Sequence, residues 1–137
     1  MKLSVVDELA SLLSGIKINR IQDKNVKATL VYDYIFLRKF AKEANEQKKD
    51  LVEKFQADWM DELTEVNSLR NNGNPVVGHD GYIEAESDAN KAIRSIFESE
   101  VDVNLRPVKL DDFLSSFCEE DLTFEQIAFM QENGILE

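Results

Sequence analysis

Apolar residues recur at steps of three and four along the middle of the chain. The stripe, with one lysine in it, consists of Leu30, Tyr34, Leu37, Ala41, Ala44, Lys48, Leu51, Phe55, Trp59, Leu63 and Val66. Such steps place side chains on one face of an α-helix. Neither glycine nor proline, which disfavour helix interiors, occurs between Ile16 and Asn72. The pattern therefore predicts one amphipathic helix over about residues 24–70.

This predicted helix is too long to be enclosed by its own chain if it is straight. At a rise of 1.5 Å per residue it is roughly 70 Å long. A compact chain of 137 residues has a radius of gyration of roughly 14 Å. The helix must then kink or project, and a projecting apolar stripe is typical of a helix that pairs with another helix. We predict that a protein partner or a second copy binds there.

The two ends of the stripe support different interpretations. Ile35, Phe36 and Phe40 widen the apolar face near residues 30–44, which favours burial within the same chain. Beyond Ala44 charged residues dominate, so pairing with another helix and an ordinary solvated helix are equally compatible with the pattern. The apolar positions of this second half are candidate partner-binding residues: Leu51, Phe55, Trp59, Leu63 and Val66.

The remaining patterns predict shorter elements. Apolar spacing predicts a short helix near the N-terminus and another over about residues 83–99. Apolar and polar residues alternate over residues 101–106, which is typical of a short strand. Two helices close the chain, one beginning at Asp111 and one with Thr123 and Gln126 in a capping box. The sequence thus predicts a mainly α fold with a minor short-strand element, in a single domain that spans the whole chain.

Charge is distributed unevenly along the chain. The net charge is -11, and residues 98–137 contain 11 acids against only Arg106 and Lys109. Nucleic-acid binding depends on lysine and arginine that neutralise phosphates, so we expect this segment to be repelled by nucleic acids and by anionic lipid. Basic proteins are the favoured partners. Candidate residues for such a contact are Asp111, Asp112, Glu119, Glu120 and Asp121.

The sequence also predicts where the protein resides. No stretch approaches the roughly 18 to 20 apolar residues of a membrane span. Asp7 and Glu8 lie where a signal peptide requires an apolar run. The single cysteine, Cys118, excludes an internal disulfide and fits a reducing compartment. We expect a protein of the cytosol, with no membrane partner and no direct nucleic-acid partner.

Residues that could carry catalysis are sparse. His79 is the only histidine, and without nearby metal-binding residues in the sequence we interpret it as an exposed loop residue. Two glutamates follow Cys118 and disfavour the thiolate that a nucleophile requires. The long helix places four acids on one face: Asp58, Asp61, Glu62 and Glu65. They could hold magnesium only opposite a second acidic pair on a facing helix, and residues 83–99 do not offer such a pair. We predict no catalytic, cofactor-binding or metal-binding residues, and hence no enzyme.

Several short motifs follow one another in a recognisable order. They are Met1-Lys2-Leu3, Leu51-Val52-Glu53-Lys54-Phe55, Asn72-Gly73-Asn74-Pro75-Val76-Val77, Glu100-Val101-Asp102-Val103, Pro107-Val108-Lys109-Leu110-Asp111-Asp112-Phe113 and Leu122-Thr123. In this order the chain resembles small proteins of tailed bacteriophages and prophages that have no assigned activity. Residues 58–70 depart from that pattern, because the predicted helix runs further. The resemblance implies a phage context and carries no functional residue across.

Two hypotheses for the function follow. In the first, the protein is a non-catalytic assembly factor or virion component that acts through protein–protein contacts of the long helix, in the cytoplasm of the bacterial host or within the virion. In the second, it is an acidic inhibitor of a host nucleic-acid enzyme, and its C-terminal segment mimics the charge of nucleic acid. Neither hypothesis requires a cofactor.

Overall fold

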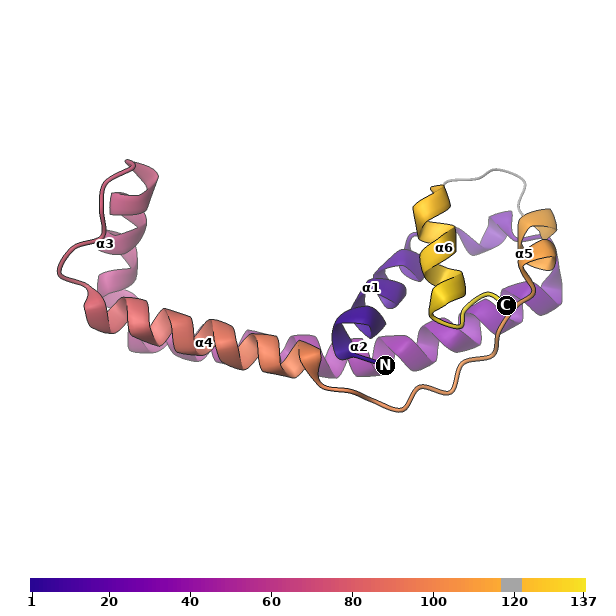
Figure 1. Cartoon of the computed structure of the whole chain (residues 1–137), viewed down its shortest axis with the longest axis horizontal. Helices are drawn as coiled ribbons and strands as arrows, with labels where there is room; N and C mark the ends of the chain where they lie inside the picture. The colour runs from indigo at the N-terminus through magenta and orange to yellow at the C-terminus, as the bar shows by residue number, and fades with distance from the viewer. Residues whose placement is uncertain (117–121) are drawn as a thin grey trace. The chain divides into compact units, whose positions relative to one another are not determined.

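The computed structural model describes residues 1–116 and 122–137 and is mainly α-helical, as the sequence predicts (Figure 1). In chain order its elements are α1 (Leu3–Ser14), the 3-10 helix η1 (Ile18–Arg20), α2 (Lys24–Asp58), α3 (Met60–Asn71), α4 (Asp80–Glu98), α5 (Leu110–Ser116) and α6 (Phe124–Glu132). They form two compact units. Unit 1 comprises Met1–Lys42 with Glu100–Glu137, and unit 2 comprises Glu43–Ser99. The single domain stays a prediction, because compactness alone does not show whether the units fold separately.

The predicted long helix is divided in two, which corrects the range of about 24–70. Trp59 has φ -122° and ψ 22° and separates α2 from α3. Its indole packs edge-on against the ring of Tyr82, with centroids 6.0 Å apart. Another indole atom would lie 3.3 Å from a Cβ built on Gly81. The contact with α4 therefore accompanies the bend, and no glycine or proline marks it in the sequence.

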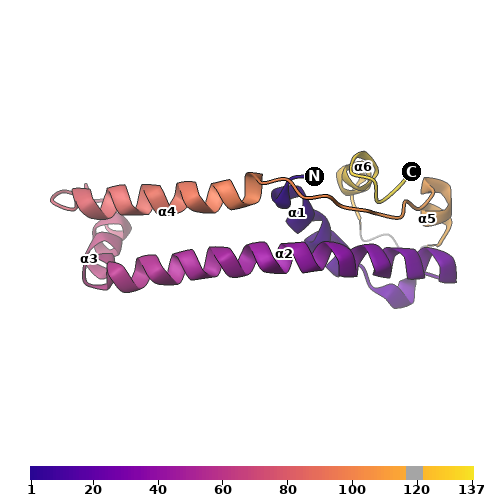
Figure 2. The ribbon, with the colours of Figure 1, turned by 90° about the horizontal axis from the view of Figure 1, so that it is seen from below.

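Unit 1 has a hydrophobic core to which all its α-helices contribute. Leu9 of α1, Leu37 of α2, Phe113 of α5 and Met130 of α6 are each at most 1% exposed. Figures 1 and 2 show α1, α5 and α6 beside the first part of α2. The stripe positions Leu30, Leu37 and Ala41 are thus buried within the chain. Of the residues that widen this apolar face in the sequence, Phe36 and Phe40 are half-buried and Ile35 is 62% exposed, so the predicted burial of the wide face is only partly confirmed.

The predicted strand is an extended segment that, among the described residues, forms only isolated β-bridges near its two ends. At its start, Met1 and Val101 exchange two hydrogen bonds of 3.1 and 2.9 Å. At its end, Val108 forms an isolated parallel bridge with Leu136. The alternating apolar residues are half-buried. Their alternation arises because one face of the extended segment packs on the core of unit 1, and not because the segment belongs to a sheet.

The capping box at the start of α6 is confirmed. The Thr123 hydroxyl accepts a hydrogen bond of 3.2 Å from the Gln126 N–H, and the Gln126 side chain accepts one of 2.9 Å from the Thr123 N–H. Two backbone donors at the helix end are thereby satisfied.

Thr123→Ala should lower the free energy of unfolding by about 0.5 to 2 kcal/mol, because alanine cannot accept the Gln126 N–H. Denaturant unfolding measures this change. Thr64→Ala, at an exposed position inside α3, is the matched control and should not destabilise, since alanine is the better helix former. An unchanged midpoint and slope for Thr123→Ala would contradict the assigned role.

Unit 2 is built from the second part of α2, α3 and α4. In this unit α2 and α4 run side by side in opposite directions (Figure 2), and α3 lies across the end of the pair (Figure 1). Val66 and Tyr82 are its most buried large side chains, at 0% and 1% exposed. Among the described residues, no helix combines the length and apolar character that a membrane crossing requires.

Candidate functional site

The apolar positions predicted to bind a partner lie in unit 2 and turn toward its own helices. Val66 is fully buried, and Leu51, Phe55, Trp59 and Leu63 are half-buried. The ring centroid of Phe55 lies 5.2 Å from that of Tyr82, and that of Trp59 lies 6.0 Å away. Aromatic pairs at such distances stabilise a core beyond their buried area. The chain's own α4 therefore covers part of the predicted partner surface.

Other apolar residues at this end of unit 2 are left in solvent. Met60, the first residue of α3, is 67% exposed, and Val77, in the loop before α4, is 76% exposed. Ile83 in the first turn of α4 is 37% exposed. Sequence reasoning missed them because they lie outside the stripe. Met60 follows the bend at Trp59, Ile83 follows Gly81, which lies against the Trp59 ring, and Val77 precedes α4 by three residues.

A polar network links α3 to α4 beside the aromatic rings. The Arg70 guanidinium donates two hydrogen bonds, of 2.9 and 2.8 Å, to the carboxylate of Glu86. The hydrogen bonds and charge of Arg70 hold the pKa of Glu86 below its ordinary value. Burial raises the pKa of Tyr82, whose hydroxyl also hydrogen-bonds to Glu86. A bidentate pair of this kind fixes the relative orientation of its two side chains more firmly than a single exposed hydrogen bond does.

His79 is not the exposed loop residue that the sequence suggested. Its side chain is 11% exposed and lies between two carboxylates of α3: Nδ1 is 2.9 Å from Glu62 Oε2, and Nε2 is 3.5 Å from Glu65 Oε1. The hydrogen bond to Glu62 and both negative charges raise the pKa of His79 above its ordinary value. Protonated His79 therefore stabilises unit 2 below the unfolded pKa, and this contribution is lost as pH rises through the raised folded pKa.

Metal binding finds no support at this cluster. Within the ranges that the structure describes, no group of three His, Cys, Asp or Glu side chains has the geometry to hold a metal ion. The helical acids considered for magnesium include Glu62 and Glu65, and both face His79. These two carboxylates of α3 interact electrostatically with His79, the residue that precedes α4.

Unit 1 contains a buried carboxyl that sequence reasoning also missed. Asp33 is 0% exposed, and its Oδ1 accepts a hydrogen bond of 2.9 Å from the Arg106 N–H. Its Oδ2 has no hydrogen-bond partner among the described residues. Burial raises the pKa of Asp33 to about 6, although the hydrogen bond and charge of Arg106 oppose the rise. The guanidinium carbon of Arg106 lies 3.8 Å from the ring centroid of Tyr32, a cation–π contact.

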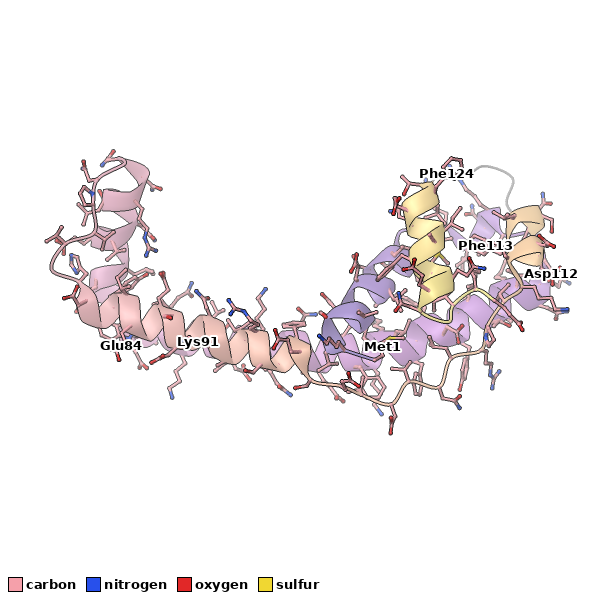
Figure 3. The ribbon with its side chains drawn as sticks, viewed as in Figure 1. Met1, Glu84, Lys91, Asp112, Phe113 and Phe124 are labelled. Carbon is pink, nitrogen blue, oxygen red and sulfur yellow. The ribbon has the colours of Figure 1, made fainter. Side chains whose placement is uncertain are left out.

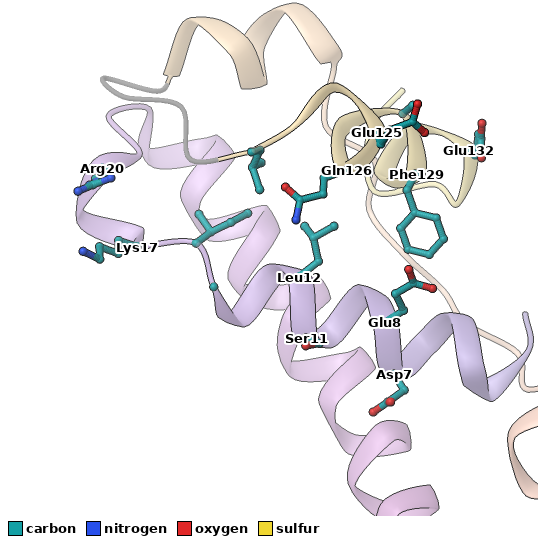
Figure 4. Close-up of a pocket in the computed structure, with 14 residues that line it drawn as sticks. Asp7, Glu8, Ser11, Leu12, Lys17, Arg20, Glu125, Gln126, Phe129 and Glu132 are labelled. Atoms are coloured by element: carbon teal, nitrogen blue, oxygen red, sulfur yellow. The ribbon is translucent and has the colours of Figure 1, made fainter.

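An open pocket of about 730 Å³ lies between α1, the turn after it and α6 (Figure 4). Lys17 and Arg20 lie at one end, while Asp7, Glu8 and acids of α6 line the rest. The volume would suit a small ligand. None of the described residues lining it is a histidine or cysteine.

The acidic candidates are only partly covered by the structure. Asp111 and Asp112 are exposed in the first turn of α5, where negative charge interacts favourably with the helix dipole. Glu119, Glu120, Asp121 and Cys118 lie outside the described residues. Residues 1–42 contain eight bases and four acids, and residues 100–137 contain ten acids and two bases. Unit 1 therefore combines a basic and an acidic part of the chain.

Comparison with protein-family models, curated proteins and solved structures finds no match to this chain.

Proposed function

We propose that this is a non-catalytic protein that acts through protein–protein contacts, and that a partner binds where α4 meets the bend between α2 and α3. The observation that carries the proposal is the solvent exposure of Met60, Val77 and Ile83 in this region. Exposed apolar side chains beside a well-packed, charged helical unit are typical of interaction surfaces. The half-buried Trp59 adds an aromatic anchor of the kind enriched at such surfaces.

The biological setting is also part of this proposal. The order of motifs from Met1-Lys2-Leu3 to Leu122-Thr123 resembles that of small tailed-phage proteins, which favours an assembly factor or virion component. Charge mimicry of nucleic acid is less well supported, because the acidic segment shares unit 1 with a basic one. The basic residues of unit 1 then neutralise part of the negative electrostatic field of the acidic segment.

The test compares the proteins that co-purify with tagged wild type and with the double variant Met60→Glu, Ile83→Glu. Both positions are exposed, so the variant should keep the helical circular dichroism of the wild type. We expect it to lose the specific partner, with a rise of more than about tenfold in the Kd measured with that partner, since charge replaces apolar contacts. Thr64→Glu, exposed on α3, is the control. Equal binding by wild type and double variant would reject this surface.

A further inference from the structure

A second apolar surface lies in unit 1 and shares no residue with the proposed partner site in unit 2. The connection after α1 and one face of α2 enclose an open groove of about 180 Å³, lined by Ile16, Ile18, Val31 and Tyr34 among others. Ile18 is 56% exposed. Ile35, one turn beyond Val31 on α2, is 62% exposed. Aliphatic side chains thus line this groove and continue onto its outer edge.

The edge of this groove is basic, although the protein as a whole is acidic. Lys27 lies one turn before Val31, and Arg38 and Lys39 lie one turn beyond Ile35. Lys17 adjoins Ile18 in the connection. In the part of the chain that the structure describes, none of these four cations forms an ion pair. The groove is therefore suited to an apolar group that carries negative charge beside it.

The same unit presents a group of that kind. Phe124, the first residue of α6, is 89% exposed and lies at the N-terminal end of the helix (Figure 3). Glu125 follows it and is also exposed, and Asp111 and Asp112 are exposed on α5 of the same unit. An isolated phenylalanine at this exposure leaves its whole ring in water, at a cost that burial would recover.

We propose that the chain associates head to tail, with Phe124 of one copy occupying the groove beside Ile18 and Ile35 of the next copy. Glu125, next to Phe124, would then face the lysines and arginine at the edge of the groove. Because the two surfaces differ, a pair of copies leaves Phe124 free on one copy and the groove free on the other, so the contact continues into a chain or a closed ring.

The chemistry favours a second copy over nucleic acid or a membrane. Nucleic acid would set charged phosphates against exposed isoleucines, and aliphatic side chains offer no stacking platform for bases. An anionic membrane would be opposed by the net charge of -11. Phe124 with the adjacent Glu125 combines apolar contact and charge complementarity.

The experiment measures the mass of the full chain by light scattering and sedimentation at concentrations up to about 1 mM, because an interface with a single anchor is small and weak. Wild type should form species larger than a monomer as concentration rises, and more weakly at high salt. Phe124→Glu and Ile35→Glu should each raise the Kd by more than about tenfold. Met60→Glu in unit 2 is the control and should associate like wild type, which separates this contact from the proposed partner site.

Mixing the two variants gives the decisive result. Phe124→Glu retains an intact groove and Ile35→Glu retains an intact Phe124, so an equimolar mixture should form one-to-one dimers and nothing larger. Dimers would also show that both variants are folded. A monomeric wild type at every concentration, association that survives both substitutions, or a mixture that stays monomeric would overturn the proposal. So would a monomeric wild type that binds single-stranded DNA or anionic vesicles through Ile35.

Discussion

Tyr82→Ala is expected to lower the free energy of unfolding of unit 2 by about 3 to 5 kcal/mol, as for other large aromatic side chains truncated in a core. Tyr82 is 1% exposed and packs against Phe55 and Trp59. Its hydroxyl also hydrogen-bonds to Glu86, which is paired with Arg70. Truncation therefore creates a cavity and removes a member of the network that links α3 to α4.

Trp59 makes this prediction measurable, because it is the only tryptophan and lies in unit 2. Its fluorescence should report an unfolding transition of Tyr82→Ala at lower denaturant, while far-ultraviolet circular dichroism reports helices of both units. Tyr82→Phe is the control, which keeps the ring and loses only a hydrogen bond, at about 1 kcal/mol. If the whole circular dichroism transition shifts with the fluorescence, the chain unfolds as one domain; if only part of it follows the fluorescence and the rest stays at the wild-type midpoint, the units unfold separately. Unchanged fluorescence transitions would mean that Tyr82 does not support unit 2.

Asp33→Asn is expected to remove a dependence of stability on pH. The pKa of Asp33 rises from its ordinary value of 3.8 to about 6 on folding. The folded state then binds the proton more tightly, so the wild type is relatively stable at low pH and loses stability as pH rises through this interval. The full loss corresponds to about 3 kcal/mol. Asparagine keeps an oxygen to accept the Arg106 N–H and has no charge to bury.

Denaturant unfolding at several pH values tests this expectation. The free energy of Asp33→Asn minus that of wild type should rise by about 2 to 3 kcal/mol between about pH 4 and pH 7. Taking the difference cancels the contribution of His79, which also falls with rising pH. Asp102→Asn, at an exposed position of the extended segment, should show no such rise. A flat difference for Asp33→Asn would mean that the buried carboxyl titrates like an exposed one.

The sequence by itself determined the local elements of the protein. Steps of three and four, the absence of glycine and proline, and the pair Thr123 and Gln126 were sufficient to predict the mainly α fold, the start of the long helix and the last cap. These features depend on residues close together in the chain, because helix periodicity and capping are local. The spacing of the stripe also predicted the burial of Leu30, Leu37 and Ala41, whereas Ile35, which widens the apolar face, is 62% exposed.

Only the tertiary structure decided which side chains meet. The bend at Trp59 accompanies a contact with Tyr82, which is distant in sequence, and no local breaker marks it. Asp33 is an acid, a residue type that is expected in solvent, yet it lies on the buried face of α2. It is accommodated there because the Arg106 N–H donates to it from the extended segment. His79 is likewise held by Glu62 across a turn. The period of a helix tells which residues share a face, but the partner of that face depends on contacts between distant segments.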